Sequence, residues 1–390
     1  MKGKQLIILT GVAAALAGVA FWSARNDSRQ TTGTGIGQKI LPTLKDQVND
    51  VTTLSIESPA ATVTVTRVDG IWRVPARWNY PADFGKVREA LKALAELKSL
   101  QTIRTTPSER AQLQLLTGAD KGSTNLDQCA TRIQLLGPGN KSLALLLLGK
   151  TRSRPGQSEN SEMGGGYPDG RYVMNEEGQT SLTGEILQEF ITPLQNWLDT
   201  DFLVLNDILS VQITHPSQDS VRVERTSPND EFKLQGTIPA DKILDQARLS
   251  QIGSTLSSLR FDDIADPKLT PETTGLDKPV VCLARTQKGD LVTINIGKSP
   301  AGETKRYATV SVAFETPVQP PVSGTNEAAV VKARMERNAQ EAAAAKTLND
   351  KLSPWIYLIP GESISAISLE RNSLLQDKPK PTENKEENKP

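Results

Sequence analysis

Residues 80–97, YPADFGKVREALKALAEL, and residues 238–259, IPADKILDQARLSQIGSTLSSL, share a Pro-Ala-Asp triplet whose aspartates, Asp83 and Asp241, are 158 positions apart. Proline has no backbone N–H to donate and suits the entry of a helix. An aspartate there accepts bonds from free N–H groups and meets the positive end of the helix dipole. Both triplets therefore predict the start of a helix. Because capping accounts for the type and position of both aspartates, we do not interpret them as a catalytic pair.

Apolar residues follow each triplet at helical spacing. Leu91 and Leu94 in the first stretch match Leu249 and Ile252 in the second at the same offset of 158 positions. Residues three, four and seven positions apart lie on one face of a helix, so each stretch predicts one amphipathic helix that covers a sheet. The pattern indicates that one folding unit occurs twice.

Alternating apolar residues precede each helix and predict a β-hairpin. TTLSIES and ATVTVTRV, from residue 52 onward, correspond to LSVQITHPSQDSVRVERT, from residue 209 onward. The turn prolines Pro59 and Pro216 are 157 positions apart. We interpret His215, the one histidine of the chain, as a turn residue beside Pro216 and not as a catalytic group.

Two further strand pairs close the units, TRIQLLGPGNKSLALLLLGK at 131–150 and VVCLARTQKGDLVTINIGK at 280–298. Each pair contains a Gly turn and ends in Gly-Lys. We therefore expect an α+β fold of two tandem related units, residues 40–203 and 204–375. Each unit is expected to be a mainly antiparallel sheet covered by an amphipathic helix.

The C-terminal part carries three further predictions. Trp355 follows Trp197 by 158 positions, so the stretch after Trp355 is interpreted as a third start whose strand closes a sheet edge. The Ala-rich stretch 326–352 predicts a polar helical insertion in the second unit. Residues 376–390 have no apolar side chains to bury and predict a disordered tail.

The N-terminus predicts a membrane anchor over residues 1–24, followed by a flexible Gly/Thr-rich tether over 25–39. An uncharged run from Gln5 to Trp22 is long enough to span about 27 Å as a helix. The flanking charges favour a cytoplasmic N-terminus, which places the bulk of the chain in the periplasm of a bacterial inner membrane. A cleaved signal peptide and a secreted protein are the alternative.

Composition and motifs exclude several classes of function. Lys plus Arg equals Asp plus Glu at 45 each, so no net basic field attracts nucleic acid. The chain has no linear nucleophile, phosphate-loop or zinc motif, and GTGIG from Gly33 follows a polar tether instead of a strand. Asp199 and Asp201 are a weak cation pattern without the ligands of a calcium loop. We therefore assign no catalytic, cofactor-binding or metal-ligating residue and no cofactor.

Two cysteines, Cys129 and Cys282, are few for an exported protein of this size. Either one disulfide or two buried thiols fits the sequence. The two cysteines occupy different places in the aligned units, so they do not form a repeated ligand set.

The stretches IPADKILDQARLSQIGSTLSSLRFDDIAD and TGLDKPVVCLARTQKGDLVTINIGK resemble a bacterial family catalogued as domain of unknown function 4340. The resemblance covers roughly residues 40–375. The first copy departs from it, with Asn125 in place of the glycine and Cys129 at the position of Pro279. The resemblance to this family implies one N-terminal membrane segment and genes beside ABC transporters of the gliding-motility kind. It identifies no functional residue.

These observations predict a non-enzymatic envelope protein, a periplasmic scaffold or accessory subunit of an ABC-transporter-like complex. Its expected partners are the membrane, through the N-terminal helix, and integral-membrane transporter subunits, with no nucleic acid. The alternative is a periplasmic module that binds a small ligand or the cell wall, and a third reading is a hydrolase without a linear motif.

Overall fold

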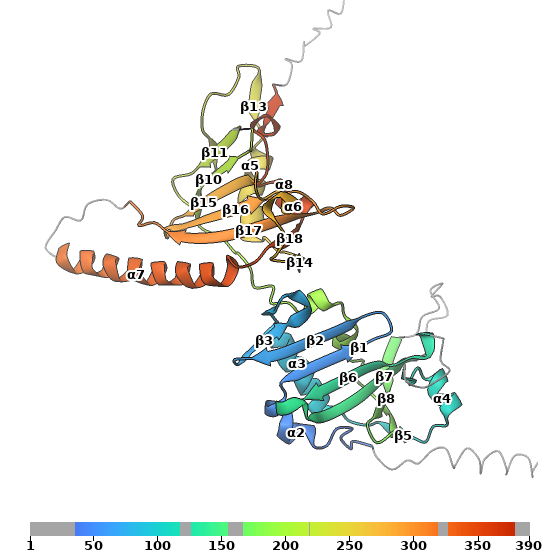
Figure 1. Ribbon diagram of the computed structural model, residues 1–390. Helices are drawn as coiled ribbons and strands as arrows, with labels where there is room; N and C mark the ends of the chain where they lie inside the picture. The colour runs from blue at the N-terminus through green and yellow to red at the C-terminus, as the bar shows by residue number, and fades with distance from the viewer. Residues whose placement is uncertain (1–35, 118–125, 155–166, 218, 319–326, 379–390) are drawn as a thin grey trace, which may run out of the picture. The chain divides into compact units, whose positions relative to one another are not determined.

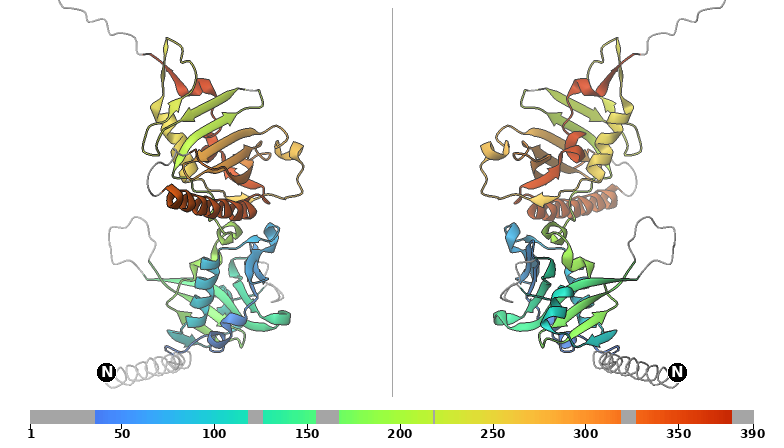
Figure 2. Two further views of the ribbon diagram at one scale, coloured as in Figure 1. Left: turned by 90° about the vertical axis from the view of Figure 1, so that its left-hand side faces the viewer. Right: turned by 90° about the vertical axis from the view of Figure 1, so that its right-hand side faces the viewer.

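The computed structural model describes residues 36–117, 126–154, 167–217, 219–318 and 327–378. The chain forms two compact units that divide between Asp199 and Thr200. Each unit combines one large antiparallel sheet with helices, so the expected α+β class is confirmed (Figures 1 and 2).

The sheet of the first unit has nine strands in the order β4-β3-β2-β1-β6-β7-β8-β9-β5. Every pair of neighbouring strands is antiparallel. The strands are β1 (Thr53–Glu57), β2 (Thr62–Val68), β3 (Ile71–Val74), β4 (Tyr80–Pro81), β5 (Gln101–Ile103), β6 (Thr131–Leu136), β7 (Ser142–Arg154), β8 (Tyr167–Asn175) and β9 (Thr180–Thr183).

One amphipathic helix, α3 (Phe84–Glu96), lies over a face of this sheet (Figure 1). The Asp83 side chain accepts a hydrogen bond from the backbone N–H of Lys86 at 3.1 Å, as the triplet predicts. Val87 and Leu94 are fully buried, so the apolar face of α3 is part of the core. The short helices α2 (Leu44–Gln47) and α4 (Pro107–Gln112) complete the unit.

The sheet of the second unit has eight strands in the order β12-β11-β10-β15-β16-β17-β18-β14, and β13 and β19 form a separate pair. The strands are β10 (Ile208–Thr214), β11 (Ser220–Glu224), β12 (Lys233–Leu234), β13 (Lys242–Leu244), β14 (Asp263–Ile264), β15 (Val280–Thr286), β16 (Asp290–Ile296), β17 (Lys305–Phe314), β18 (Tyr357–Pro360) and β19 (Leu375–Asp377). The helices are α5 (Gln246–Ser257), α6 (Pro271–Thr274), α7 (Glu327–Leu352) and α8 (Gly361–Ser365).

The two sheets have the same strand order. The run β3-β2-β1-β6-β7-β8-β9-β5 corresponds strand for strand to β12-β11-β10-β15-β16-β17-β18-β14, and only β4 is extra. The registers also correspond, because Ile56 faces Ile133 in the first sheet as Ile213 faces Cys282 in the second. A short turn joins β8 to β9, whereas α7 stands between β17 and β18.

The helix of the second unit starts one turn later than the sequence predicts. Asp241 caps no helix, because Lys242 donates its N–H to the Pro239 carbonyl and then begins β13. The cap of α5 is Asp245, which accepts from the Arg248 N–H at 3.1 Å. Residues four positions apart lie on nearly the same helix face. The apolar periodicity therefore fits a helix that starts after Asp241 as well as one that starts after Asp245.

The prediction of a third start is wrong, although the expected strand after Trp355 exists and joins the sheet of the second unit. Tyr357–Pro360 forms β18, which lies between β17 and β14 and takes the place that β9 has in the first unit. Ile364 belongs to α8 and Ile367 follows that helix, so neither is in a strand. The residues after Trp355 therefore complete the second unit, and its matching distance from Trp197 has no structural counterpart.

The ends of the described chain are more ordered than expected. Gly37 and Ile40 donate backbone hydrogen bonds to Ser99 and Leu97, so the last residues of the expected tether lie against the first unit. β19 pairs with β13, so structured chain continues into the expected tail. The expected anchor 1–24 and most of the expected tail lie outside the described residues. None of the helices described here is long and apolar enough to span a membrane.

Candidate functional site

The single histidine sits at a turn, where the sequence places it. His215 donates its backbone N–H to the Asp219 carbonyl at 2.8 Å in the β10–β11 turn. Its ring Nε2 lies 3.1 Å from the Leu369 carbonyl oxygen. These contacts fix the ring against the backbone of the second unit.

Asp199 and Asp201 have separate surroundings. The backbone of Asp199 bonds to β4, since its N–H donates to the Pro81 carbonyl and its carbonyl accepts from the Tyr80 hydroxyl. The Asp201 carboxylate accepts from Lys351 Nζ at 3.1 Å. Within the described ranges, no three His, Cys, Asp or Glu side chains are grouped closely enough to hold a metal ion.

Neither Cys129 nor Cys282 is in a disulfide bond, and the two lie in different units. Cys282 is fully buried in β15, at the place that Ile133 occupies in β6. Burial raises the pKa of the Cys282 thiol to about 12. Cys282 therefore serves as a small apolar side chain of the core.

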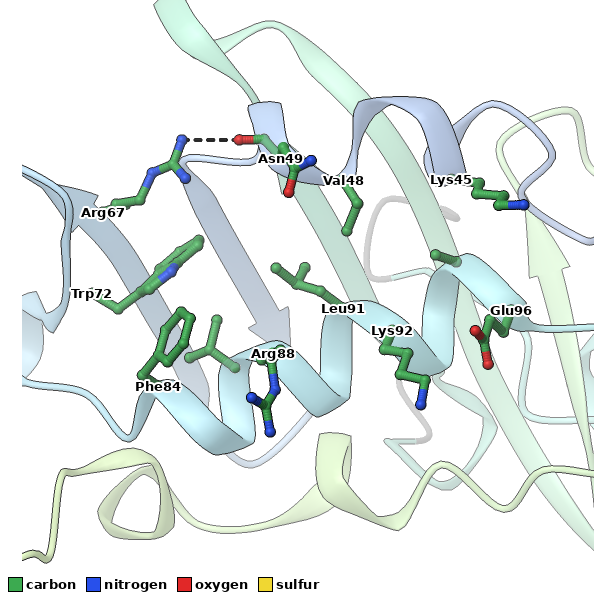
Figure 3. A pocket seen from close by; sticks show the side chains of 12 residues that line it. Lys45, Val48, Asn49, Arg67, Trp72, Phe84, Arg88, Leu91, Lys92 and Glu96 are labelled. Carbon is green, nitrogen blue, oxygen red and sulfur yellow. Dashed lines mark hydrogen bonds between the residues drawn. The ribbon is translucent and has the colours of Figure 1, made fainter.

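The first unit has a groove along α3, which we name the α3 groove (Figure 3). It has a volume of about 450 Å³, within the range of roughly 300–1,000 Å³ typical of small-molecule sites. It is lined by Lys45, Val48, Asn49, Arg67, Trp72, Phe84, Val87, Arg88, Leu91, Lys92, Ala95 and Glu96.

Helix α3 and strands β2 and β3 position most of this lining, and Lys45, Val48 and Asn49 come from α2 and the 3₁₀ turn after it. The Asp83 cap fixes the start of α3, which places Phe84, Arg88 and Leu91 along one side of the helix. On the sheet, Arg67 of β2 pairs in register with Trp72 of β3, and the guanidinium lies 5.9 Å from the centre of the indole ring.

The groove combines an apolar floor with a cationic rim. Trp72 is only 5% exposed and Leu91 7%, whereas Phe84 at the mouth is 62% exposed. Positive charges line the rim at Lys45, Arg67, Arg88 and Lys92, and Glu96 is the one carboxylate of the lining. Such an arrangement suits a ligand that has an apolar body and a negative charge.

The second unit has a groove at the corresponding place, which we name the α5 groove, of about 340 Å³. Extending the β11–β12 register by one residue beyond each strand gives Arg225 the position of Arg67 and Phe232 the position of Trp72. The Arg225 guanidinium lies 4.4 Å from the centre of the Phe232 ring. Counting from the two helix caps, Ser250 corresponds to Arg88, and in the same way Gly253, Ser254 and Ser257 replace Leu91, Lys92 and Ala95.

The charge of the α5 groove is also different. Asp230 and Glu231 belong to its lining, and the one basic side chain there is Arg225. Arg225 Nε donates to the Ile208 carbonyl at 2.6 Å. Burial lowers the pKa of this guanidinium, and the nearby Asp230 and Asp207 carboxylates oppose that effect. This cation is held within its own unit.

Sequence reasoning named none of the α3 groove residues as a site. A signal was present, because Phe84, Arg88 and Lys92 follow one another at intervals of four on a helix whose other face is apolar. An exposed aromatic next to two cations is unusual on a solvated face. The contribution of Arg67 and Trp72 depends on strand register and is visible only in the fold.

Comparison with known proteins gives one match. A family model described as a domain of unknown function (DUF4340) matches residues 72–279, more than half of the chain. The matched region begins in β3 and ends just before β15, so it includes both α3 and α5. No curated protein and no solved structure matches the chain.

Proposed function

The chain belongs to the DUF4340 family, and on that premise we propose that it is a non-enzymatic envelope protein. In this proposal an N-terminal helix anchors two copies of one α+β folding unit on the periplasmic side of a bacterial inner membrane. The protein acts there as a scaffold or accessory subunit of an ABC-transporter-like complex. The common strand order of the two sheets supports the duplication.

Helix α7 is the observation that carries the scaffold function. It is inserted at the β17–β18 connection, where the first unit has only a short turn. Its C-terminal half packs on β17 and buries Ala345 and Leu352 (Figure 1). The Asn349 side chain also accepts from the Val312 N–H at 3.0 Å, which fixes this half on the sheet.

The N-terminal half of α7 has exposed apolar residues. Val330, Val331 and Met335 are 39%, 41% and 67% exposed. Val330 and Val331 flank the line of the helix face that buries Ala345 and Leu352 further along. An apolar helix face that continues beyond its own packing partner is typical of a contact with another protein.

Site-specific photo-crosslinking in membranes tests this proposal on the full chain. A crosslinkable side chain at Val331 or Met335 is expected to join the protein to an integral-membrane transporter subunit, identified by mass spectrometry. The matched control is Lys346, an exposed position in the half of α7 that packs on β17.

The proposal predicts crosslinks from the first two positions and none from Lys346. Equal products from all three positions, or none from any of them, would contradict it. Two further variants, Val331→Asp and Met335→Asp, are expected to remove the contact without changing the thermal stability, because both side chains are exposed.

A further inference from the structure

We propose that the α3 groove binds a single-chain anionic amphiphile, an alkyl chain that ends in a carboxylate. This inference is independent of the scaffold function, because it concerns a different unit and a different surface. It rests on the floor of the groove, on the charge of its rim and on the contrast with the α5 groove.

The floor of the groove is apolar. Trp72, Leu91 and Ala95, each 5–7% exposed, line it between α3 and the sheet, and Val87 in the same wall is fully buried. Phe84 stands at one end with most of its ring in solvent (Figure 3). An alkyl chain that lies in the groove removes apolar area from water at about 25 cal/mol per Å².

The rim selects a negative charge. Arg88 and Lys92 project from successive turns of α3, and Lys45 belongs to α2 (Figure 3). Arg88 already pairs with Glu89 at 3.1 Å, but both side chains are more than 60% exposed, and such exposed pairs are weak. A carboxylate at the rim gains charge-assisted hydrogen bonds to cations that an uncharged head group does not make.

The groove favours an alkyl chain over an extended peptide. It lies between α3 and the face of the sheet, and the Trp72 carbonyl in β3 already accepts a hydrogen bond from the Ala82 N–H. The Asn49 carbonyl beside it already accepts from Arg67 Nη2 at 3.1 Å. A buried peptide needs partners for each N–H and C=O, whereas an alkyl chain needs none.

The α5 groove provides an internal negative control. The hydroxyls of Ser250, Ser254 and Ser257 bond to carbonyls of their own helix at 2.9–3.1 Å. Phe232 packs so close to Gly253 that a Cβ there would lie 3.2 Å from the ring. Asp230 and Glu231 repel an anion. The α5 groove therefore lacks the cationic rim, and its helix side is polar, although Leu205, Ile208 and Phe232 also line it.

The test uses the full chain in membrane vesicles and a dodecanoate that carries a photoreactive diazirine. Irradiation is expected to label α3 and β3, and unlabelled dodecanoate is expected to compete. The diazirine analogue of dodecanol, which has the same chain without the charge, is expected to label these segments about tenfold less.

A triple variant, Phe84→Gln, Arg88→Ser and Lys92→Ser, gives three positions of α3 the residues found at the corresponding positions of α5. All three side chains are exposed, so the fold is expected to survive. Labelling of α3 and β3 is expected to fall about tenfold. The matched control, Lys141→Ser with Lys150→Ser, removes two exposed lysines of the same unit outside the groove and is expected to leave labelling unchanged.

Three results would overturn the proposal: equal labelling by the alcohol, undiminished labelling in the triple variant, or no label in α3 and β3 of the unaltered chain. Circular dichroism of each variant separates loss of the site from loss of the fold. Because α7 is unchanged in every variant, the crosslinks from Val331 and Met335 report independently on the scaffold function.

Discussion

The α3 and α5 grooves occupy the same place in two units of the same strand order, and their side chains differ. Both have an arginine over an aromatic ring at corresponding positions, Arg67 over Trp72 and Arg225 over Phe232. The helix side of the first groove is apolar and cationic, while that of the second is made of serines and glycine. The two units therefore share the placement of their backbones, while a few positions on one helix face set the chemistry of each groove.

The equivalence of the two helices is tested most strongly in their cores. Leu94→Ala and Leu256→Ala remove equally buried side chains, eleven positions after each cap. Each is expected to lower the free energy of unfolding by about 2–5 kcal/mol, measured by denaturant titration, because each leaves a cavity. If one substitution leaves the stability unchanged, the two leucines are not equivalent. The residue-by-residue alignment of α3 with α5, on which the comparison of the grooves depends, would then be wrong.

A pair of glycines tests the equivalence of β7 and β16, since Gly149 of β7 corresponds in register to Gly297, which follows β16. A Cβ on Gly149 would lie 2.3 Å from the Leu113 carbonyl oxygen, and a Cβ on Gly297 would lie 2.2 Å from that of Thr274. Gly149→Ala and Gly297→Ala are each expected to cost about 1–3 kcal/mol of stability through overpacking.

The control for the glycine pair is Gly184→Ala, whose added Cβ makes an ordinary contact at 3.4 Å with Leu100. This change is expected to stay within about 0.5 kcal/mol of the unaltered protein. A cost at Gly184 as large as at the other two glycines would show that the close carbonyls are not the cause.

The corrected start of α5 predicts a smaller effect. Asp245→Ala removes a helix cap and is expected to lower the melting temperature by roughly 2–4 °C, whereas Asp241→Ala leaves it unchanged. Equal effects at both positions would contradict the corrected start.

The same cap predicts a pH dependence. The Arg248 N–H, and then the Gln376 side chain, hold the pKa of Asp245 below its ordinary value of 3.8. A lowered pKa in the folded state stabilises the protein above the unfolded pKa, and this contribution disappears as the pH falls through the folded one. The difference in melting temperature between the unaltered protein and Asp245→Asn is therefore expected to narrow below about pH 4. A difference that stays constant down to pH 2 would contradict the role of the carboxylate.

The last and smallest predicted effect concerns the reactivity of the Cys282 thiol. Burial raises the pKa of the Cys282 thiol to about 12, so iodoacetamide at pH 8 is expected to modify it only after unfolding. Peptide mass spectrometry of native and unfolded protein measures this. Rapid modification in the native state would show that Cys282 is accessible to solvent, unlike Ile133 at the corresponding position of β6.

The sequence predicts the strands and helices better than their equivalences. Hairpins, the Asp83 cap and the α7 helix follow from local periodicity and capping chemistry. The Asp241 cap fails because a four-residue slip keeps an apolar helix pattern in phase, and the third start fails because tryptophan spacing carries no strand register. The α3 groove is only half visible in sequence, since Phe84, Arg88 and Lys92 are local, whereas Trp72 and Lys45 reach it through the tertiary fold.

The most direct test of the central claim compares the two grooves within one molecule. After irradiation with the diazirine dodecanoate, mass spectrometry measures the label on peptides that contain α3 and on peptides that contain α5. We predict at least about tenfold more label on α3, because only that groove combines an apolar floor with a cationic rim. Equal label on the two helices, or more on α5, would contradict the account.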